Sequence, residues 1–119
     1  MPERMRRVNE SVRAVIAEAV ADLKDPRIGI VTVTGVEISP DLHTGKVFVS
    51  VLGNEKKRRA TLAGLESAHG FLQSRIAREL TLKRTPQLSF EYDATVERGV
   101  RMGKLIDELV HDAPADEPD

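Results

Sequence analysis

The sequence predicts one α+β domain in which helices cover one face of a three-stranded sheet. Two long segments repeat apolar residues at helical spacing, and three shorter segments are rich in β-branched residues or alternate apolar with polar residues. Their order is helix, strand, strand, interrupted helix, strand and a short last helix, which suits a layered α+β fold. At 119 residues the chain is long enough for one domain. Because aromatic residues make up only 3% of the chain, the core must be mostly aliphatic.

The first half of the chain predicts a helix followed by a β-hairpin. One apolar stripe predicts an amphipathic helix over residues 4–24, and Pro26 ends it because its ring disfavours helical geometry at Asp25. The segment IGIVTVTGVEIS predicts a strand over about 29–38, and SPDLHTG reads as the connection. KVFVSVL predicts a second strand over 46–52, with Val47, Val49 and Val51 on one face and Phe48 on the other.

The second half predicts a long interrupted helix, a strand and a last helix. Asn54 is suited to cap a helix over about 55–80, which Gly70 interrupts. QLSFEYD alternates apolar residues and predicts a third strand, and apolar spacing over about 96–110 predicts a short last helix. We therefore expect a folded domain over residues 1–111, followed by a disordered acidic tail over 112–119.

The net charge of −1 conceals a basic body with an acidic end. The last thirteen residues carry six acidic residues and no Lys or Arg. Without them, residues 1–106 hold 18 basic and 13 acidic residues, a net charge of +5. This pattern predicts a surface that binds a polyanion, although an ordinary solvated surface is an equally good explanation from composition alone.

Other classes of protein find little support in the residues. The chain has no Cys, which excludes disulfides and thiolate metal sites and favours an intracellular location. No apolar run approaches the roughly 20 residues that span a membrane, and MPERMRRVNE does not resemble a secretory signal. Nucleophile-elbow, phosphate-loop and His-pair motifs are missing, and His43, His69 and His111 fall on separate predicted elements. We therefore expect no enzyme, no metal site and no cofactor.

Three segments carry a resemblance to a known family. They are DPRIGIVTVTGVEISPDLHTGKVFVSV, SAHGFLQSRIARELTLKRTPQLSFEYD and RGVRMGKLIDEL. Together they closely resemble the bacterial ribosome-binding factor A family. The resemblance implies a type II K-homology-like fold, in which an Ala-x-Gly kink replaces the usual Gly-x-x-Gly loop that clamps nucleic-acid backbone. Ala68, His69 and Gly70 match that kink.

The kink and the basic residues around it form the predicted RNA-binding site. Physically, Gly70 is expected to relax the backbone so that two helices meet at an angle, and the resemblance makes this bend the RNA-facing corner. Phe71 beside it would offer a stacking face or pack under a strand. The predicted phosphate ligands are Arg75 and Arg78 on the solvent side of the following helix, Lys83 and Arg84 just after it, and Lys56, Lys57, Arg58 and Arg59 in an earlier turn. Arg4, Arg6 and Arg7 would form a third patch.

The resemblance also implies a function. It predicts a non-catalytic, cytoplasmic and monomeric assembly factor that binds the immature small (30S) ribosomal subunit and its rRNA, and assists maturation and 5′-end processing of the 16S rRNA. It further implies release with the help of a GTPase and particular importance in the cold. The alternative is a protein-interaction module that pairs a partner strand with its sheet edge. Phosphate binding would weaken steeply with salt, whereas strand addition would weaken much less.

Overall fold

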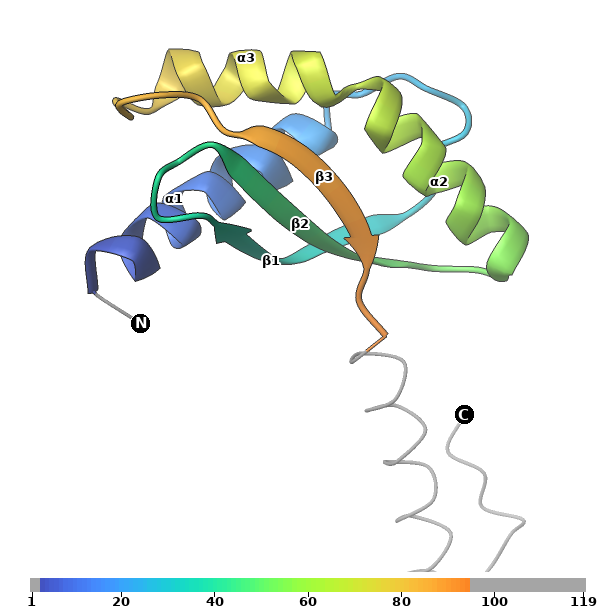
Figure 1. Cartoon of the computed structure of the whole chain (residues 1–119). Coiled ribbons are helices and arrows are strands. Elements are labelled where there is room, and N and C mark those ends of the chain that lie inside the picture. Colours follow the sequence, from blue (N-terminus) through green and yellow to red (C-terminus); the bar gives the residue numbers. More distant parts are fainter. Residues whose placement is uncertain (1–2, 95–119) are drawn as a thin grey trace, which may run out of the picture.

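The computed structural model describes residues 3–94, which form a three-stranded sheet with helices packed against it (Figure 1). The elements are α1 (Glu3–Val20), β1 (Val31–Ile38), β2 (Thr44–Val51), α2 (Glu55–Ser67), α3 (His69–Glu79) and β3 (Gln87–Tyr92). The predicted order is confirmed as far as the third strand. The helix expected near 96–110 and the tail expected at 112–119 lie outside the described residues.

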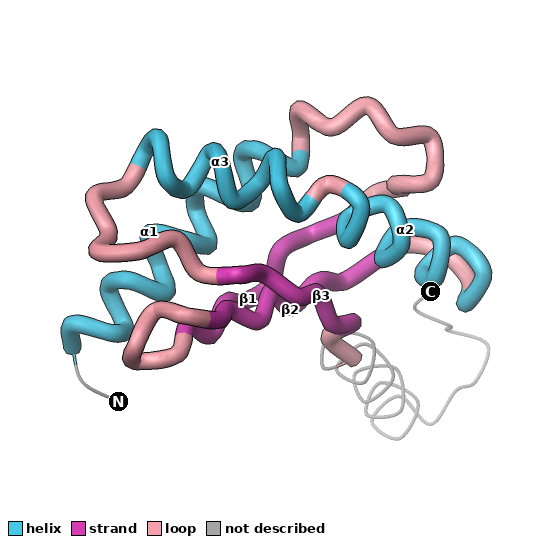
Figure 2. Tube along the Cα trace, turned by 45° about the horizontal axis from the view of Figure 1, so that its top comes forward, coloured by secondary structure: helices cyan, strands magenta, loops and turns pink. Residues whose placement is uncertain are grey.

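The sheet has the strand order β1-β2-β3, with β2 in the centre. β1 and β2 form an antiparallel hairpin in which Val33 lies opposite Val49. β3 runs parallel to β2 and places Phe90 beside Val47, so α2 and α3 together form the crossover between them. Figure 2 shows the helices gathered on one side of the sheet.

The core lies between that side of the sheet and the helices. Along β2, Val47, Val49 and Val51 are buried while Phe48 on the opposite face is half-buried, which confirms the predicted alternation. From the helices, Ile16, Leu65 and Leu72 are fully buried against them. The core is aliphatic, as the scarcity of aromatic residues predicts.

α1 ends at Val20, four residues before the end predicted at 24. Pro26 restricts only the residue directly before it, so it does not fix where the helix stops. The chain instead turns through two tight backbone bonds, from Asp22 N–H to the Ala19 carbonyl at 3.0 Å and from Leu23 N–H to the Val20 carbonyl at 3.1 Å. These bonds satisfy helix-end carbonyls and fold the half-buried Leu23 back toward the core.

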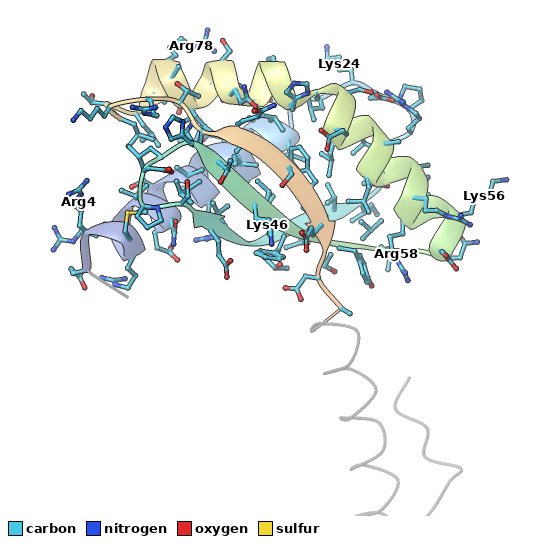
Figure 3. The ribbon with its side chains drawn as sticks, in the orientation of Figure 1. Arg4, Lys24, Lys46, Lys56, Arg58 and Arg78 are labelled. Atoms are coloured by element: carbon cyan, nitrogen blue, oxygen red, sulfur yellow. The ribbon has the colours of Figure 1, made fainter. Side chains whose placement is uncertain are left out.

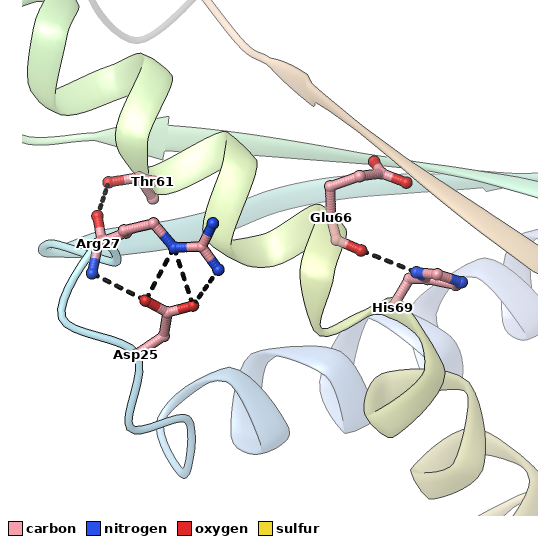
Figure 4. A network of polar contacts seen from close by, with 5 residues as sticks. All are labelled: Asp25, Arg27, Thr61, Glu66 and His69. Carbon is pink, nitrogen blue, oxygen red and sulfur yellow. Dashed lines mark hydrogen bonds and ion pairs between the residues drawn. The ribbon is translucent and has the colours of Figure 1, made fainter.

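The Asp-Pro-Arg loop is held in a closed shape by its own side chains and packs on α2 (Figure 4). Asp25 accepts from the backbone N–H of Arg27 at 2.9 Å and from its Nη2 at 2.6 Å. The fully buried Thr61 hydroxyl accepts from Gly29 N–H at 3.1 Å. A Cβ on Gly64 would lie 2.6 Å from Ile28 Cγ1, so only glycine lets the loop come this close. Because Gly29 bonds to α2, β1 begins at residue 31 and not at 29.

The interrupted helix is two helices, and the predicted kink is confirmed. Asn54 caps α2 as expected, because its Oδ1 accepts from Lys57 N–H at 2.9 Å. The break itself is at Ala68, whose φ of −95° and ψ of 8° leave the helical region. Gly70 already lies inside α3, so the expectation that Gly70 relaxes the backbone at the bend is wrong. A Cβ on Gly70 would meet nothing within 4 Å, so neither backbone strain nor crowding calls for glycine there.

Candidate nucleic-acid interface

The end of α3 and the loop after it carry three of the predicted phosphate ligands: Arg78, Lys83 and Arg84, here called the α3 basic end. All three side chains are exposed. Arg78 lies in the last turn of α3, where a cation is favoured by the helix dipole. Within residues 3–94, neither Arg78 nor Lys83 pairs with a carboxylate. Their charges are therefore available to an external anion.

Arg84 contacts a histidine that lies far from it in the sequence. Its Nη1 lies 2.7 Å from Nε2 of His43, in the β1–β2 hairpin. Because a guanidinium can only donate, the imidazole accepts this hydrogen bond. The hairpin presents His43 outward because Leu42, at a φ of +63°, turns its own side chain into the core. The pair joins residues 41 positions apart, so no local pattern predicts it.

Arg75 does not point to solvent, and its expected exposure is wrong. Its side chain is 13% exposed and lies between α1 and α3. The guanidinium is 2.8 Å from Glu79, 3.0 Å from Asp22 and 3.7 Å from Glu18. The hydrogen bonds to Glu79 and then Asp22 raise the pKa of Arg75 above its ordinary value. This charge is compensated inside the protein, so Arg75 as a phosphate ligand stays a prediction with weaker support than Arg78.

The first turns of α2 hold the second predicted cluster, here called the α2 basic turn: Lys56, Lys57, Arg58 and Arg59. Lys56 is exposed, and the stem of Lys57 lies over Gly29 and Gly53. Arg58 stacks over the ring of Tyr92 at 4.0 Å, and Arg59 lies 3.9 Å from Glu55. The cluster therefore wraps around the helix, as its sequence spacing predicts, and only part of it faces one direction.

The structure does not bring the two clusters together. Figure 3 shows Lys56 and Arg58 at the α2 end of the molecule, Arg78 on the outer side of α3, and Arg4 apart from both at the start of α1. The third expected patch lies at the start of α1, where Arg4 and Arg7 line one groove with residues 80–82 after α3. Arg6 and Arg7 of that patch both pair with Glu3, whereas Arg4 pairs with no carboxylate of residues 3–94.

The corner at residues 68–70 is held by a histidine. Nδ1 of His69 lies 2.7 Å from the backbone oxygen of Glu66, and since a carbonyl only accepts, the ring donates to the last turn of α2 (Figure 4). His69 is thus part of the bend. Phe71 beside it is 43% exposed, which leaves ring surface open to solvent. Its centroid lies 5.9 Å from the Arg75 guanidinium.

The described residues offer neither a cluster of metal ligands nor a helix that could span a membrane. Across residues 3–94, no three His, Asp or Glu side chains converge in a way that would hold a metal ion. No helix within that range is both long and apolar enough to cross a bilayer.

Known proteins resemble this chain in both sequence and structure. Residues 4–106 match the family model described as "Ribosome-binding factor A". A ribosome-binding factor A from Thioalkalivibrio sulfidiphilus is 43% identical over 98% of this chain and 91% of its own. A crystal structure of ribosome-binding factor A from Thermus thermophilus has a TM-score of 0.67 at 27% identity, covering 74% of this chain and 94% of that one.

The same Thermus thermophilus protein also appears in a ribosomal complex. A homology model of Thermus thermophilus ribosome-binding factor A, fitted into a cryo-electron-microscopy map of a complex between 30S and that factor, has a TM-score of 0.61 at 28% identity, covering 71% of this chain and 90% of that one. The α+β fold and its kink are those of a K-homology-like domain, as expected. The chain belongs to the ribosome-binding factor A family.

Proposed function

We propose that this protein binds the immature 30S subunit and, without catalysing a reaction itself, promotes late maturation and 5′-end processing of the 16S rRNA. Two findings support the proposal: family membership over residues 4–106, and a related structure fitted into a 30S complex. The family is one of ribosome-binding factors and not a class of enzymes.

The observation that carries the proposal is the α3 basic end. Arg78 and Lys83 are exposed and have no carboxylate partner in residues 3–94, and Arg84 contacts a ring nitrogen of His43 and not a carboxylate of that range. Most other arginines of the described chain, such as Arg6, Arg13 and Arg27, pair with nearby acids. A surface that keeps some cations unpaired while pairing most others suits a partner with regularly spaced phosphates.

The finer parts of the proposal rest on the family resemblance. We expect a cytoplasmic monomer that leaves the subunit with the help of a GTPase and matters most in the cold. A strain lacking the protein, grown at low temperature, should accumulate 30S subunits whose 16S rRNA keeps an unprocessed 5′ end. Normal processing in that strain would contradict the maturation role while leaving subunit binding open.

Salt dependence tests the electrostatic mechanism directly. If about four phosphates are neutralised, single-stranded RNA should give a slope near −3 in a log–log plot of affinity against salt, from about −0.7 per contact. Reversing two cations, Arg78→Glu with Lys83→Glu, should make the slope shallower by about 1.4 and weaken co-sedimentation with 30S subunits. A flat salt dependence of the unmodified protein would exclude phosphate docking.

Strand addition to a sheet edge receives less support. β1 carries a bulge between Val33 and Gly35, which distorts that edge. At the other edge, the backbone N–H of Leu88 donates to Oε1 of Gln73 on α3 at 2.9 Å. A partner strand would have to displace this bond or pair with a distorted edge, so RNA docking is the better-supported function.

A further inference from the structure

A groove runs between the start of α1 and the segment that follows α3, here called the α1–α3 groove. Its volume is about 530 Å³, within the range of about 300 to 1,000 Å³ typical of ligand sites. It is lined by Glu3, Arg4, Arg7, Val8 and Ser11 from α1, and by Leu80, Thr81 and Leu82. We propose that this groove holds one unpaired nucleotide of the rRNA, with the base on its apolar floor and the phosphates at its cationic rim. The proposal rests on the RNA-binding function proposed above.

The floor of the groove is aliphatic. Val8, Leu80 and Leu82 are half-buried and pack against the core, so their remaining surface forms a firm apolar base. Leu80 is held by the bond from its N–H to the Ile76 carbonyl at 2.9 Å, which ends α3. The flat face of a nucleobase is apolar enough to cover such a floor. A fully solvated phosphate chain alone would gain nothing from it.

The rim of the groove is cationic. Arg4 is exposed and pairs with no carboxylate of residues 3–94, whereas the Nε of Arg7 lies 3.2 Å from Glu3. Glu3 is the one acidic residue in the lining, and it already accepts hydrogen bonds from Arg6 and Arg7. Lys83 and Arg84 of the α3 basic end follow Leu82 directly. Phosphates on either side of a bound nucleotide would therefore meet positive charge.

Two hydroxyls complete the site. Ser11 on one wall and Thr81 on the other are exposed, and each offers a donor and an acceptor. Such groups suit the polar edge of a base or a ribose hydroxyl. An acidic peptide would pair with the cationic rim but leave the two hydroxyls without hydrogen-bond partners. An apolar peptide would cover the floor but leave the cationic rim unpaired. A nucleotide is the occupant whose chemistry matches all three parts.

Charge reversal at the rim has a matched control on the same helix. Arg4 lines the α1–α3 groove, while Arg13, which pairs with Glu10, lines a different hollow beside β1. Binding of a labelled single-stranded RNA hexamer should weaken about tenfold for Arg4→Glu and less than threefold for Arg13→Glu at the same salt. Equal losses for both variants would overturn the site, because they would report only the overall charge.

Whether a base occupies the groove is tested by introducing a large side chain at one wall or the other. The unmodified protein should bind the hexamer about tenfold more tightly than a hexamer whose sugars carry no bases. Ser11→Trp and, independently, Thr81→Trp should remove that difference while the melting temperature and the salt slope stay the same. Two walls are used because one variant could misfold. If baseless RNA binds equally well to the unmodified protein, or an acidic peptide competes better than RNA, the groove is not a nucleotide site.

These outcomes are separate from the failure of the proposed function. Binding of 30S subunits by the unmodified protein tests the function, and the Arg4, Ser11 and Thr81 variants test the groove. If the unmodified protein co-sediments with 30S subunits but does not prefer RNA that carries bases, the proposed function stands and the nucleotide site in the groove is excluded. A protein that does not bind 30S subunits at all would lose the proposed function.

Discussion

The two sides of α3 use the same residue type for opposite purposes. Arg75 and Arg78 are three residues apart, so their Cβ atoms lie only about 60° apart around the helix axis. Arg75 turns into the contact between α1 and α3, here called the α1–α3 seam, and meets three carboxylates there. Arg78 remains exposed at the end of the helix. A difference of about 60° in position around the axis of α3 therefore separates an arginine that pairs with carboxylates inside the protein from one that stays exposed.

The largest expected effect separates these two arginines. Arg75→Glu would place a fourth carboxylate among Glu18, Asp22 and Glu79, and we expect the melting temperature to fall by at least about 10 °C. Arg78→Glu carries the same change in charge at an exposed site, where stability normally shifts by less than about 0.5 kcal/mol. Thermal unfolding followed by circular dichroism measures both.

Binding should show the reverse order. Arg78→Glu is expected to weaken association with 30S subunits while the protein stays folded. Arg75→Gln keeps a polar side chain in the seam without adding a negative charge, so at a temperature where it is folded it should bind almost normally. Strong loss of binding by a folded Arg75→Gln protein would show that Arg75 contacts RNA after all.

The same contrast explains what the sequence could and could not predict. Local patterns predicted the order of the elements, the Asn54 cap and the buried face of β2, because each depends on neighbours along the chain. They also predicted an interruption of the long helix, although they placed it at Gly70 and not at Ala68. Arg75 was placed wrongly because its partner Asp22 lies 53 residues away, and helical spacing alone does not identify which neighbouring element packs beside it. The groove beside Arg4 was missed for the same reason, since it joins residues from opposite ends of the described chain.

Gly64 gives the next largest effect. It lies on the inner side of α2, where a Cβ would meet Ile28 Cγ1 at 2.6 Å. Gly64→Ala should therefore destabilise the protein by about 1 to 2 kcal/mol in denaturant unfolding, although alanine favours helix more than glycine. Adding Ile28→Val, which shortens the opposing side chain, should recover part of the loss. If the Gly64→Ala protein is more stable than the unmodified one, the Asp-Pro-Arg loop can move away from α2 at little cost and make room for the added Cβ.

The Asp25 contact with Arg27 predicts a smaller effect that depends on pH. The hydrogen bonds from Arg27 lower the pKa of Asp25 below its usual 3.8. A lowered carboxyl pKa adds stability above the unfolded value, and this stability is lost as the pH falls through the folded value. Asp25→Asn should therefore lower the melting temperature by no more than about 4 °C at pH 7, and the difference from the unmodified protein should shrink below pH 3.8. A difference that stays constant down to pH 2.5 would show that the ion pair contributes nothing.

Gly70 is expected to give the smallest change in stability, and it completes the comparison with Gly64. Both glycines lie in helices around the same bend, but a Cβ on Gly70 would meet nothing within 4 Å. Glycine costs about 1 kcal/mol relative to alanine in a helix interior and less near a helix start, so Gly70→Ala should stabilise the protein by at most about 0.5 kcal/mol.

The fold therefore gives no reason for glycine at position 70, and close approach of rRNA to this corner stays a prediction from the family resemblance. We expect Gly70→Ala to weaken association with 30S subunits several-fold, and Gly70→Val to weaken it further, because each added atom holds the rRNA backbone away from the start of α3. Ala77→Val, on an exposed position of the same helix, is the control for β-branching alone. If the Gly70 variants and the control bind 30S subunits as tightly as the unmodified protein, the start of α3 does not face the subunit, and the contact must be sought at the α3 basic end alone.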